Sequence, residues 1–413
     1  MSKFKIKLQG DKVIWGLVII LSVISLLAVY SSTGLLAFIE KGGDTEYYFQ
    51  KHFVIVILGL IFMFVAHKVN YPFYANIARW AIFIAIPLLI YTLVSGDVVN
   101  SAARWNRIPI LGITFQTSDL AKLALIMFVA YVLTVKQNEL SNFKSGLSLV
   151  LIISVIVSLL VAYSNLSTGV IIFAICFCMM FYAGARMKHI LLISGAGIFI
   201  FLILISSLLI MHKFESRNTS KELAQTVDVN TKQSRLKQTN RASTWQGRIV
   251  NFFTGEEDKD SDANYQSRHS KIAIANGGIT GKMPGNSSQK TFLPNSHSDF
   301  IYAIIVEEYG LIGGIVVLLI YVIFFFRGIS ISINAPGTFG ALLAFGITIS
   351  ITIQAFVNIL VAVGLFPVTG QNLPLISMGG SSNWFTSISI GMLLSISAFD
   401  DREKELKTLK TDN

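Results

Sequence analysis

Charged side chains are scarce in this sequence. Asp, Glu, Lys and Arg make up 14% of the 413 residues, whereas hydrophobic residues make up 53%. A water-soluble domain usually carries about 25% charged residues, so this chain has too little polar surface to cover a soluble body. The apolar content also excludes a disordered chain. The sequence therefore predicts an integral membrane protein.

Cysteine and the common catalytic motifs are scarce as well. Cys176 and Cys178 lie two residues apart in one apolar run, so a helix would direct them to different sides. This spacing excludes a disulfide framework, and we interpret both residues as small buried hydrophobic side chains. The sequence has no P-loop, no H-E-x-x-H and no Ser/His/Asp elbow, which argues against ATP-driven transport by this chain and against protease chemistry. No cofactor motif is evident, and a divalent cation is not excluded.

The excess of positive charge has a membrane interpretation. Lys and Arg number 33 against 23 Asp and Glu, which gives a formal net charge of +10. These residues lie between and beside apolar runs instead of on one polar face, so a nucleic-acid partner is not expected. The charges indicate membrane orientation instead.

Long apolar runs dominate the rest of the chain. A span needs roughly 20 apolar residues, and the sequence offers about ten candidates. They lie near 13–33, 51–67, 73–94, 119–136, 146–163, 166–184, 189–211, 300–327, 338–364 and 381–399. Only Ser164 and Asn165 separate the fifth run from the sixth. The predicted fold is an all-α integral membrane protein with about ten transmembrane helices.

Positive residues in the short loops set the orientation. They fall on one side with the basic N-terminus, so both termini are expected in the cytoplasm. The other side then holds 34–50, 95–118, a long loop at 212–299 between helices seven and eight, and 364–380. We assign 1–400 to one polytopic domain that includes this loop, and 401–413 to a cytoplasmic tail. Within the loop, a helix is expected from Tyr265 onward.

The first polar segment stands at the start of the fourth run. Asp119 and Lys122 are three residues apart, so a helix places them on one face where they can pair. One interpretation is that Ser118 and Asp119 cap the helix N-terminus and Lys122 lowers the cost of burial. The other is functional, because ionisable groups at membrane depth are candidates for a site.

The second polar segment leads into the eighth run. It reads His297-Ser298-Asp299-Phe300-Ile301 and continues to Glu307-Glu308-Tyr309-Gly310. Asp299 lies where the long loop meets the membrane, and a carboxylate there could act as a general base. The alternative is again a helix cap by Ser298 or Asp299.

The third polar segment joins the last two runs. Residues 364–382 contain Pro367, Pro374 and several glycines, which forbid a continuous helix and predict a structured or re-entrant loop. Gln354 and Asn358, inside the ninth run, are more typical of interhelical hydrogen bonds than of ligand contacts.

Together these segments resemble the family named for shape, elongation, division and sporulation (SEDS). The resemblance covers nearly the whole chain. Its specific parts are the two stretches at 297–310, the stretch from Pro367-Val368-Thr369-Gly370 through Leu373-Pro374 to Gly379-Gly380-Ser381-Ser382, and the pairs Arg104-Trp105 and Phe115-Gln116. The chain departs from the family pattern at Thr117 (usually Pro), Asp119 (usually Glu) and Asn165 (usually Asp).

The resemblance implies a peptidoglycan glycosyltransferase that polymerises lipid II at the outer face of the bacterial cytoplasmic membrane. It implies Asp299 as the catalytic residue, a class B penicillin-binding protein and other division proteins as partners, and contact with membrane lipids. We expect a substrate-binding role for five further residues: Arg104, Gln116, Asp119, Lys122 and His297.

The segment at 285–294 is more similar to the division members of the family than to the elongation members, which suggests a place at the division septum. Two alternatives remain: a flippase that transports lipid II, and a non-catalytic division scaffold. A flippase should show a polar path through the bilayer centre, and the sequence offers little of one beyond Gln354 and Asn358.

Overall fold

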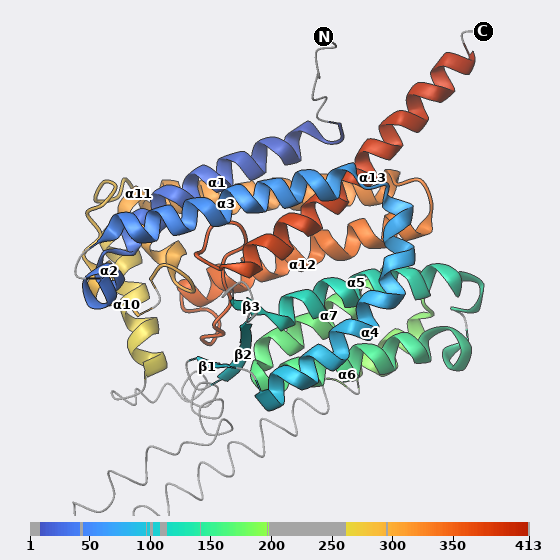
Figure 1. Ribbon diagram of the computed structural model, residues 1–413, viewed down its shortest axis with the longest axis horizontal. Helices are drawn as coiled ribbons and strands as arrows, with labels where there is room; N and C mark the ends of the chain where they lie inside the picture. The colour runs from blue at the N-terminus through green and yellow to red at the C-terminus, as the bar shows by residue number, and fades with distance from the viewer. Residues whose placement is uncertain are drawn as a thin grey trace, which may run out of the picture.

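The computed structural model describes residues 9–41, 44–95, 97–99, 102–107, 114–140, 142–195, 197, 262–294 and 296–411. Within them the chain is a bundle of roughly aligned helices (Figure 1). The N-terminal part contains α1 Lys12–Ser32, α2 Gly34–Lys41, α3 Thr45–Lys68, α4 Tyr71–Ser95, α5 Thr117–Val135, α6 Ser148–Ser164 and α7 Leu166–Tyr182. The C-terminal part contains α10 Asp262–Gly277, α11 Ile301–Asn334, α12 Thr338–Ala362 and α13 Ser381–Thr411. Short helical turns lie at η1 Gln137–Glu139, η2 Phe143–Leu147 and η3 Gln289–Thr291.

Six of the described helices are long and apolar enough to cross a membrane: α1, α3, α4, α5, α11 and α12. The helices α6 and α7 are apolar but have 17 residues each. These helices coincide with expected runs one to six, eight and nine, and α13 contains the tenth. Most of the seventh run, 189–211, lies outside the described residues, as does 212–261 of the long loop. The helical membrane fold is therefore established, and the count of ten stays a prediction.

Polar side chains begin several of these helices where the sequence changes from loop to apolar run. Asp11 caps α1 by accepting from the backbone N–H groups of Val13 and Ile14 at 2.8 and 3.1 Å. Its other carboxylate oxygen pairs with Arg327 of α11. Asn165 caps α7, which ends α6 at Ser164 and confirms the predicted division of that apolar stretch into two helices.

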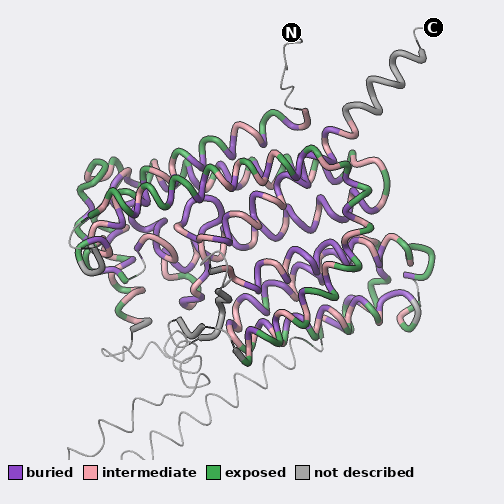
Figure 2. Tube along the Cα trace, viewed as in Figure 1, coloured by how far each residue is buried: buried purple, intermediate pink, exposed green. Residues whose placement is uncertain are grey.

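Among the six candidate spans, α5 and α12 are the most enclosed. In each, 67% of the most apolar 18-residue window is buried, against 28% in α3 and α4. Figure 2 shows exposed residues mainly along the outer sides of the bundle, where a lipid environment would contact them. Polar groups carried by α5 and α12 are therefore held inside the protein.

A small antiparallel sheet was not predicted. The strands β1 Asp97–Val99, β2 Ala102–Arg107 and β3 Thr114–Gln116 pair in the order β1-β2-β3 and connect α4 to α5. The strands are three to six residues long, which is too short for an alternating pattern to be recognised beside the apolar runs. The sheet sets the position at which α5 begins.

The helix α11 is interrupted at Gly310, whose φ of 72° is outside the helical region. A Cβ atom at this position would lie 2.1 Å from the carbonyl oxygen of Ile279, and one at Gly281 would lie 2.2 Å from the carbonyl oxygen of Glu308. The loop after α10 therefore packs directly on the α11 backbone, a contact that only glycine permits.

The last helix extends beyond the tenth apolar run. The helix α13 continues to Thr411, through the segment predicted as a cytoplasmic tail, and the boundary at residue 400 stays a prediction. Residues 401–411 are rich in Glu, Lys and Leu, which favour helix without any apolar partner. The beginning of α1 and the end of α13 lie at the same end of the bundle, and α2 and α10 lie at the opposite end (Figure 1).

Candidate active site

Asp299 lies in the turn that precedes α11 and is half-buried. The N-cap residue of α11 is Phe300, which makes no side-chain cap hydrogen bond. Ser298 and Asp299 precede it in the turn, so the helix begins later than an N-cap at either residue would place it.

A set of hydrogen bonds to three consecutive backbone carbonyls holds the Asp299 turn. The carbonyl of His297 accepts from the backbone N–H of Met378 at 2.9 Å. The carbonyl of Ser298 accepts from the Ser377 hydroxyl at 2.5 Å, and the carbonyl of Asp299 accepts from Asn358 Nδ2 at 2.7 Å. The segment that carries Asp299 is thus fixed by α12 and by the loop between α12 and α13.

This loop is non-helical from residue 363 to residue 380, as its prolines and glycines predict. Gln371 donates to the Thr168 hydroxyl of α7 at 2.6 Å. On the other side, the Ser25 hydroxyl donates to the carbonyl of Ile376 and lies 2.7 Å from His52 Nε2. Hydrogen bonds with α1 and α7 therefore hold the loop, and His52 of α3 supports the α1 contact through Ser25.

A second polar group lies at the start of α5. Lys122 Nζ is 3.4 Å from Asp119 Oδ1, which confirms the predicted pairing. The N-cap residue of α5 is Gln116, so Ser118 and Asp119 occupy the first turn and the interpretation of either one as the N-cap is wrong. Asp119 Oδ2 is buried and has no hydrogen-bond partner among the described residues. A buried carboxylate oxygen without a partner is energetically costly and marks a place where a ligand or water can bind.

Asp119 and Lys122 line a pocket between three helices. Its other polar lining comes from Ser350 and Gln354 of α12 and from Thr386 and Ser389 of α13, and the remainder is apolar. Lys122 Nζ also donates to Gln354 Oε1 at 2.8 Å. The ammonium group is thus partly paired and is positioned by two helices.

The remaining candidate residues lie close to these groups in the chain. Gln116 ends β3; its backbone N–H donates to the Ser381 hydroxyl at 2.9 Å, and its side chain donates to Ser118. Arg104 lies in β2 at the irregular step between the pairs Asp97–Trp105 and Val98–Ala103. His297 is half-buried in the Asp299 turn. The candidate residues therefore lie in two places. Gln116, Asp119 and Lys122 lie at the start of α5, and His297 and Asp299 lie in the turn before α11.

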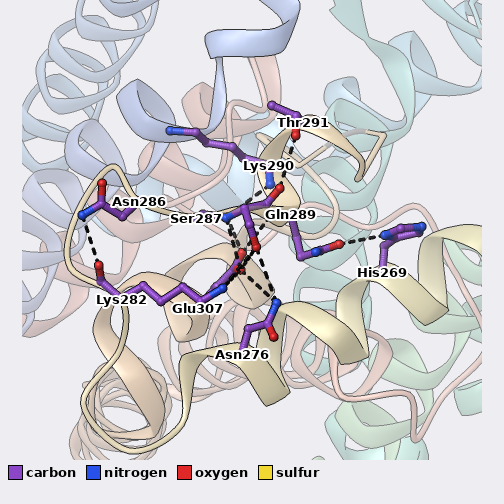
Figure 3. A network of polar contacts seen from close by, with 10 residues as sticks. His269, Asn276, Lys282, Asn286, Ser287, Gln289, Lys290, Thr291 and Glu307 are labelled. Carbon is purple, nitrogen blue, oxygen red and sulfur yellow. Dashed lines mark hydrogen bonds and ion pairs between the residues drawn. The ribbon is translucent and has the colours of Figure 1, made fainter.

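Glu307 forms the densest polar network in the described part of the chain. Its side chain is fully buried on α11, where it pairs with Lys282 Nζ at 3.1 Å (Figure 3). Its carboxylate also accepts hydrogen bonds from the Ser287 hydroxyl, the Ser288 backbone and hydroxyl, the Gln289 backbone and Asn276 Nδ2. Charge-assisted bonds of this kind are stronger than neutral ones. Glu307 therefore anchors the loop 282–291 to the helix that follows Asp299.

Among the described residues, no group of three or more His, Cys, Asp or Glu side chains is arranged to hold a metal ion. The polar groups of the site are carboxylates, one ammonium group, amides and hydroxyls.

One known protein family matches this chain over nearly all of the helices described above. Residues 11–402 match the FtsW/RodA/SpoVE family of cell cycle proteins. This chain belongs to that family.

Among SEDS-family relatives, a Geobacter sp. (strain M18) protein named "Probable peptidoglycan glycosyltransferase FtsW" is 32% identical over 394 residues, which cover 94% of this chain and 96% of the relative. Stage V sporulation protein E of Bacillus subtilis (strain 168) is 30% identical over 398 residues, which cover 95% and 98%. The chain is thus similar to these relatives over nearly their full lengths.

Solved structures of the SEDS fold are also similar. A chain from a peptidoglycan synthase complex, described for its coordination of polymerization and crosslinking, aligns with a TM-score of 0.70 at 22% identity and covers 95% of this chain and 99% of that chain. Rod shape determining protein RodA of Thermus thermophilus aligns with a TM-score of 0.62 at 21% identity, covering 94% and 96%. At these identities the similarity establishes the shared fold.

The contacts that fix the geometry of this site were not predicted from the sequence. Glu307 stands in one of the family motifs without an expected structural role, and no separate role was expected for Gln371 or Ser377. A signal was nonetheless present, because Gln354 and Asn358 are four residues apart in an apolar run and so share one helix face. The catalytic and binding roles of the six candidate residues stay predictions.

Proposed function

We propose that this chain is a peptidoglycan glycosyltransferase that polymerises lipid II into glycan strands during septal cell-wall synthesis. The observation that carries the proposal is the turn at Asp299, whose carbonyls are held by α12 and by the 363–380 loop beside a membrane-spanning helix. Membership of the SEDS family and the names of the Geobacter relatives support the reaction class.

The reaction needs a base and a group that stabilises the leaving pyrophosphate. In this proposal the Asp299 carboxylate removes the proton from an acceptor-sugar hydroxyl as its oxygen attacks the anomeric carbon of the other substrate. The bond from that carbon to undecaprenyl pyrophosphate breaks, and the pyrophosphate leaves with the electron pair. Lys122 supplies a positive charge suited to phosphate oxygens, and Asp119 holds that charge in place.

The direct test is reconstitution of the purified full chain with lipid II, with and without a class B penicillin-binding protein, which we propose as its partner. Glycan strands of many disaccharide units are the expected product. Transport of lipid II across the bilayer without glycan would favour the flippase, and glycan formation by the partner alone would favour the scaffold. Parallel reactions with Mg²⁺ and with a chelator test whether the reaction requires a divalent cation.

Replacement of Lys122 by Ala is expected to reduce polymerisation about 10- to 100-fold. A charge-assisted hydrogen bond contributes about 1.5–3 kcal/mol, and each 1.4 kcal/mol corresponds to a factor of ten in rate. The measurement is the initial rate of glycan formation at equal membrane abundance. The matched control is Lys136→Ala at the other end of α5, where Lys136 pairs with the exposed Glu139. Equal activity in both variants would reduce Lys122 to a structural partner of Asp119.

We further propose that both termini are cytoplasmic in the inner membrane and that 212–299 is extracytoplasmic. In a chain with Cys176 and Cys178 replaced by Ala, an impermeant maleimide is expected to label Thr280→Cys in intact cells. Ser330→Cys should react only after lysis. Both positions are exposed and flank 300–327, the apolar run predicted as the eighth span, so the reverse pattern would contradict this orientation.

A further inference from the structure

Two amide side chains lie inside α12, a helix that is otherwise apolar enough to span a membrane. Gln354 is 5% exposed and Asn358 is 1% exposed. They are four residues apart, so they occupy adjacent turns of one face, about 6 Å apart along the helix axis. Buried amides are costly unless hydrogen-bonded, and their partners therefore show what they do.

Gln354 connects α5 to the loop between α12 and α13. Its Oε1 accepts from Lys122 Nζ at 2.8 Å, and its Nε2 donates to the carbonyl of Asn372 at 3.0 Å. One side chain thus uses its acceptor for the ammonium group of the Asp119–Lys122 pair and its donor for the loop.

Asn358 connects the same loop to the Asp299 turn. Its Nδ2 donates to the carbonyl of Asp299 at 2.7 Å and to the carbonyl of Gln371 at 2.7 Å. Both N–H groups are used, while Oδ1 is buried without a hydrogen-bond partner in the part of the chain that the structure describes. The two N–H donors therefore orient the Asn358 side chain, and its role is to bind these two carbonyls.

The carbonyls held on the loop belong to neighbouring residues. Gln371 is bound by Asn358, and Asn372 is bound by Gln354. Two consecutive peptide groups of the loop are therefore held from two adjacent turns of one helix. The same two side chains reach Asp299 on one side and Lys122 on the other.

We propose that Gln354 and Asn358 are positioning residues that fix the Asp299 turn and Lys122 relative to each other across α12. This inference rests on the proposed function, because it assigns a task to the two groups of that site. Asn358 acts through the backbone of Asp299, and Gln354 acts through the ammonium group of Lys122. A change at Asn358 displaces the Asp299 turn, and a change at Gln354 displaces the Lys122 ammonium group. In both cases the charged side chain itself is unchanged.

The proposal predicts different kinetic effects for the two residues. Asn358→Leu, which keeps the branched shape of the side chain and lacks donors, should lower kcat at least tenfold with KM for lipid II changed less than threefold. Gln354→Met should lower kcat and also raise KM, because Lys122 is the proposed phosphate-binding group. Gln354→Glu keeps an acceptor for Lys122, so its KM should be close to that of the parent.

The matched control is Thr352→Val on the same helix. The Thr352 hydroxyl is buried without a hydrogen-bond partner among the described residues, so this variant changes an α12 side chain without breaking a contact. It should keep the parent kcat and KM. Where Asn358→Leu fails to accumulate, Asn358→Ser retains one donor and should show a smaller loss of kcat.

Hydrogen–deuterium exchange of the full chain in detergent tests the positioning without using the reaction. Asn358→Leu should accelerate amide exchange at 371–378 and 297–300 at least tenfold relative to the parent and to Thr352→Val. Parent-like kcat in Asn358→Leu, a matching loss in Thr352→Val, or unchanged exchange at 371–378 would each overturn the proposal. A parent chain that makes no glycan would instead contradict the proposed function, and the exchange measurement would then decide alone whether the amides hold the loop.

Discussion

Asp299→Asn is expected to reduce lipid II polymerisation by about 10²- to 10⁴-fold, the contribution typical of a general base. Asn keeps the size of the side chain and leaves the backbone carbonyl free to accept from Asn358. The variant should therefore fold, insert and bind its partner normally while losing the group that removes a proton. The measurement is glycan formation from purified lipid II at equal protein concentration.

The control for this variant is Asp44→Asn. Asp44 caps α3 by accepting from the backbone N–H of Tyr47 at 3.1 Å, and Asn is an equally good cap. Parent-like activity is expected for it. Substantial glycan product from Asp299→Asn would exclude Asp299 as the base, whatever the control does.

Glu307→Leu is expected to destabilise the protein strongly. The change leaves the donors of the 282–291 loop without their acceptor, and each buried donor without a partner costs about 1–3 kcal/mol. Lys282, which is 36% exposed, can turn to water and adds less to the loss. The measurement is the midpoint of thermal unfolding in detergent, together with protease cleavage within 282–291, which should become faster.

The neighbouring carboxylate provides the comparison. Glu308 is also buried and accepts from the Ser31 hydroxyl, a contact that Gln can keep. Glu308→Gln should therefore unfold close to the parent temperature. A similar midpoint for Glu307→Leu and the parent would show that the loop is held by its backbone contacts with α11 instead.

The sequence predicted those parts of the fold that depend on local composition. Apolar runs located the helices, and the break at Asn165 and the non-helical 363–380 loop followed from capping and from proline and glycine. The sheet at 97–116 and the continuation of α13 to Thr411 were missed, because short strands and a charged helix leave no apolar period to detect.

The candidate site was predictable only in part. The pairing of Asp119 with Lys122 follows from a spacing of three residues within one helix. The bonds from Asn358 to Asp299 and from Ser377 to Ser298 join residues 59 and 79 positions apart, and no local pattern specifies such contacts. The same reason explains why a helix cap stood as an alternative for Asp299 and Asp119, since a cap is what local sequence alone suggests for an acid at a helix start.

The interruption at Gly310 divides α11 into two parts. Residues 301–309 form a short helical segment that one non-helical residue separates from 311–334. One end of this segment adjoins Asp299, and Glu307 near the other end binds the 282–291 loop. The loop and the Asp299 turn are therefore joined through one short helical segment, and the close contact of Gly310 with the Ile279 carbonyl fixes where that segment ends.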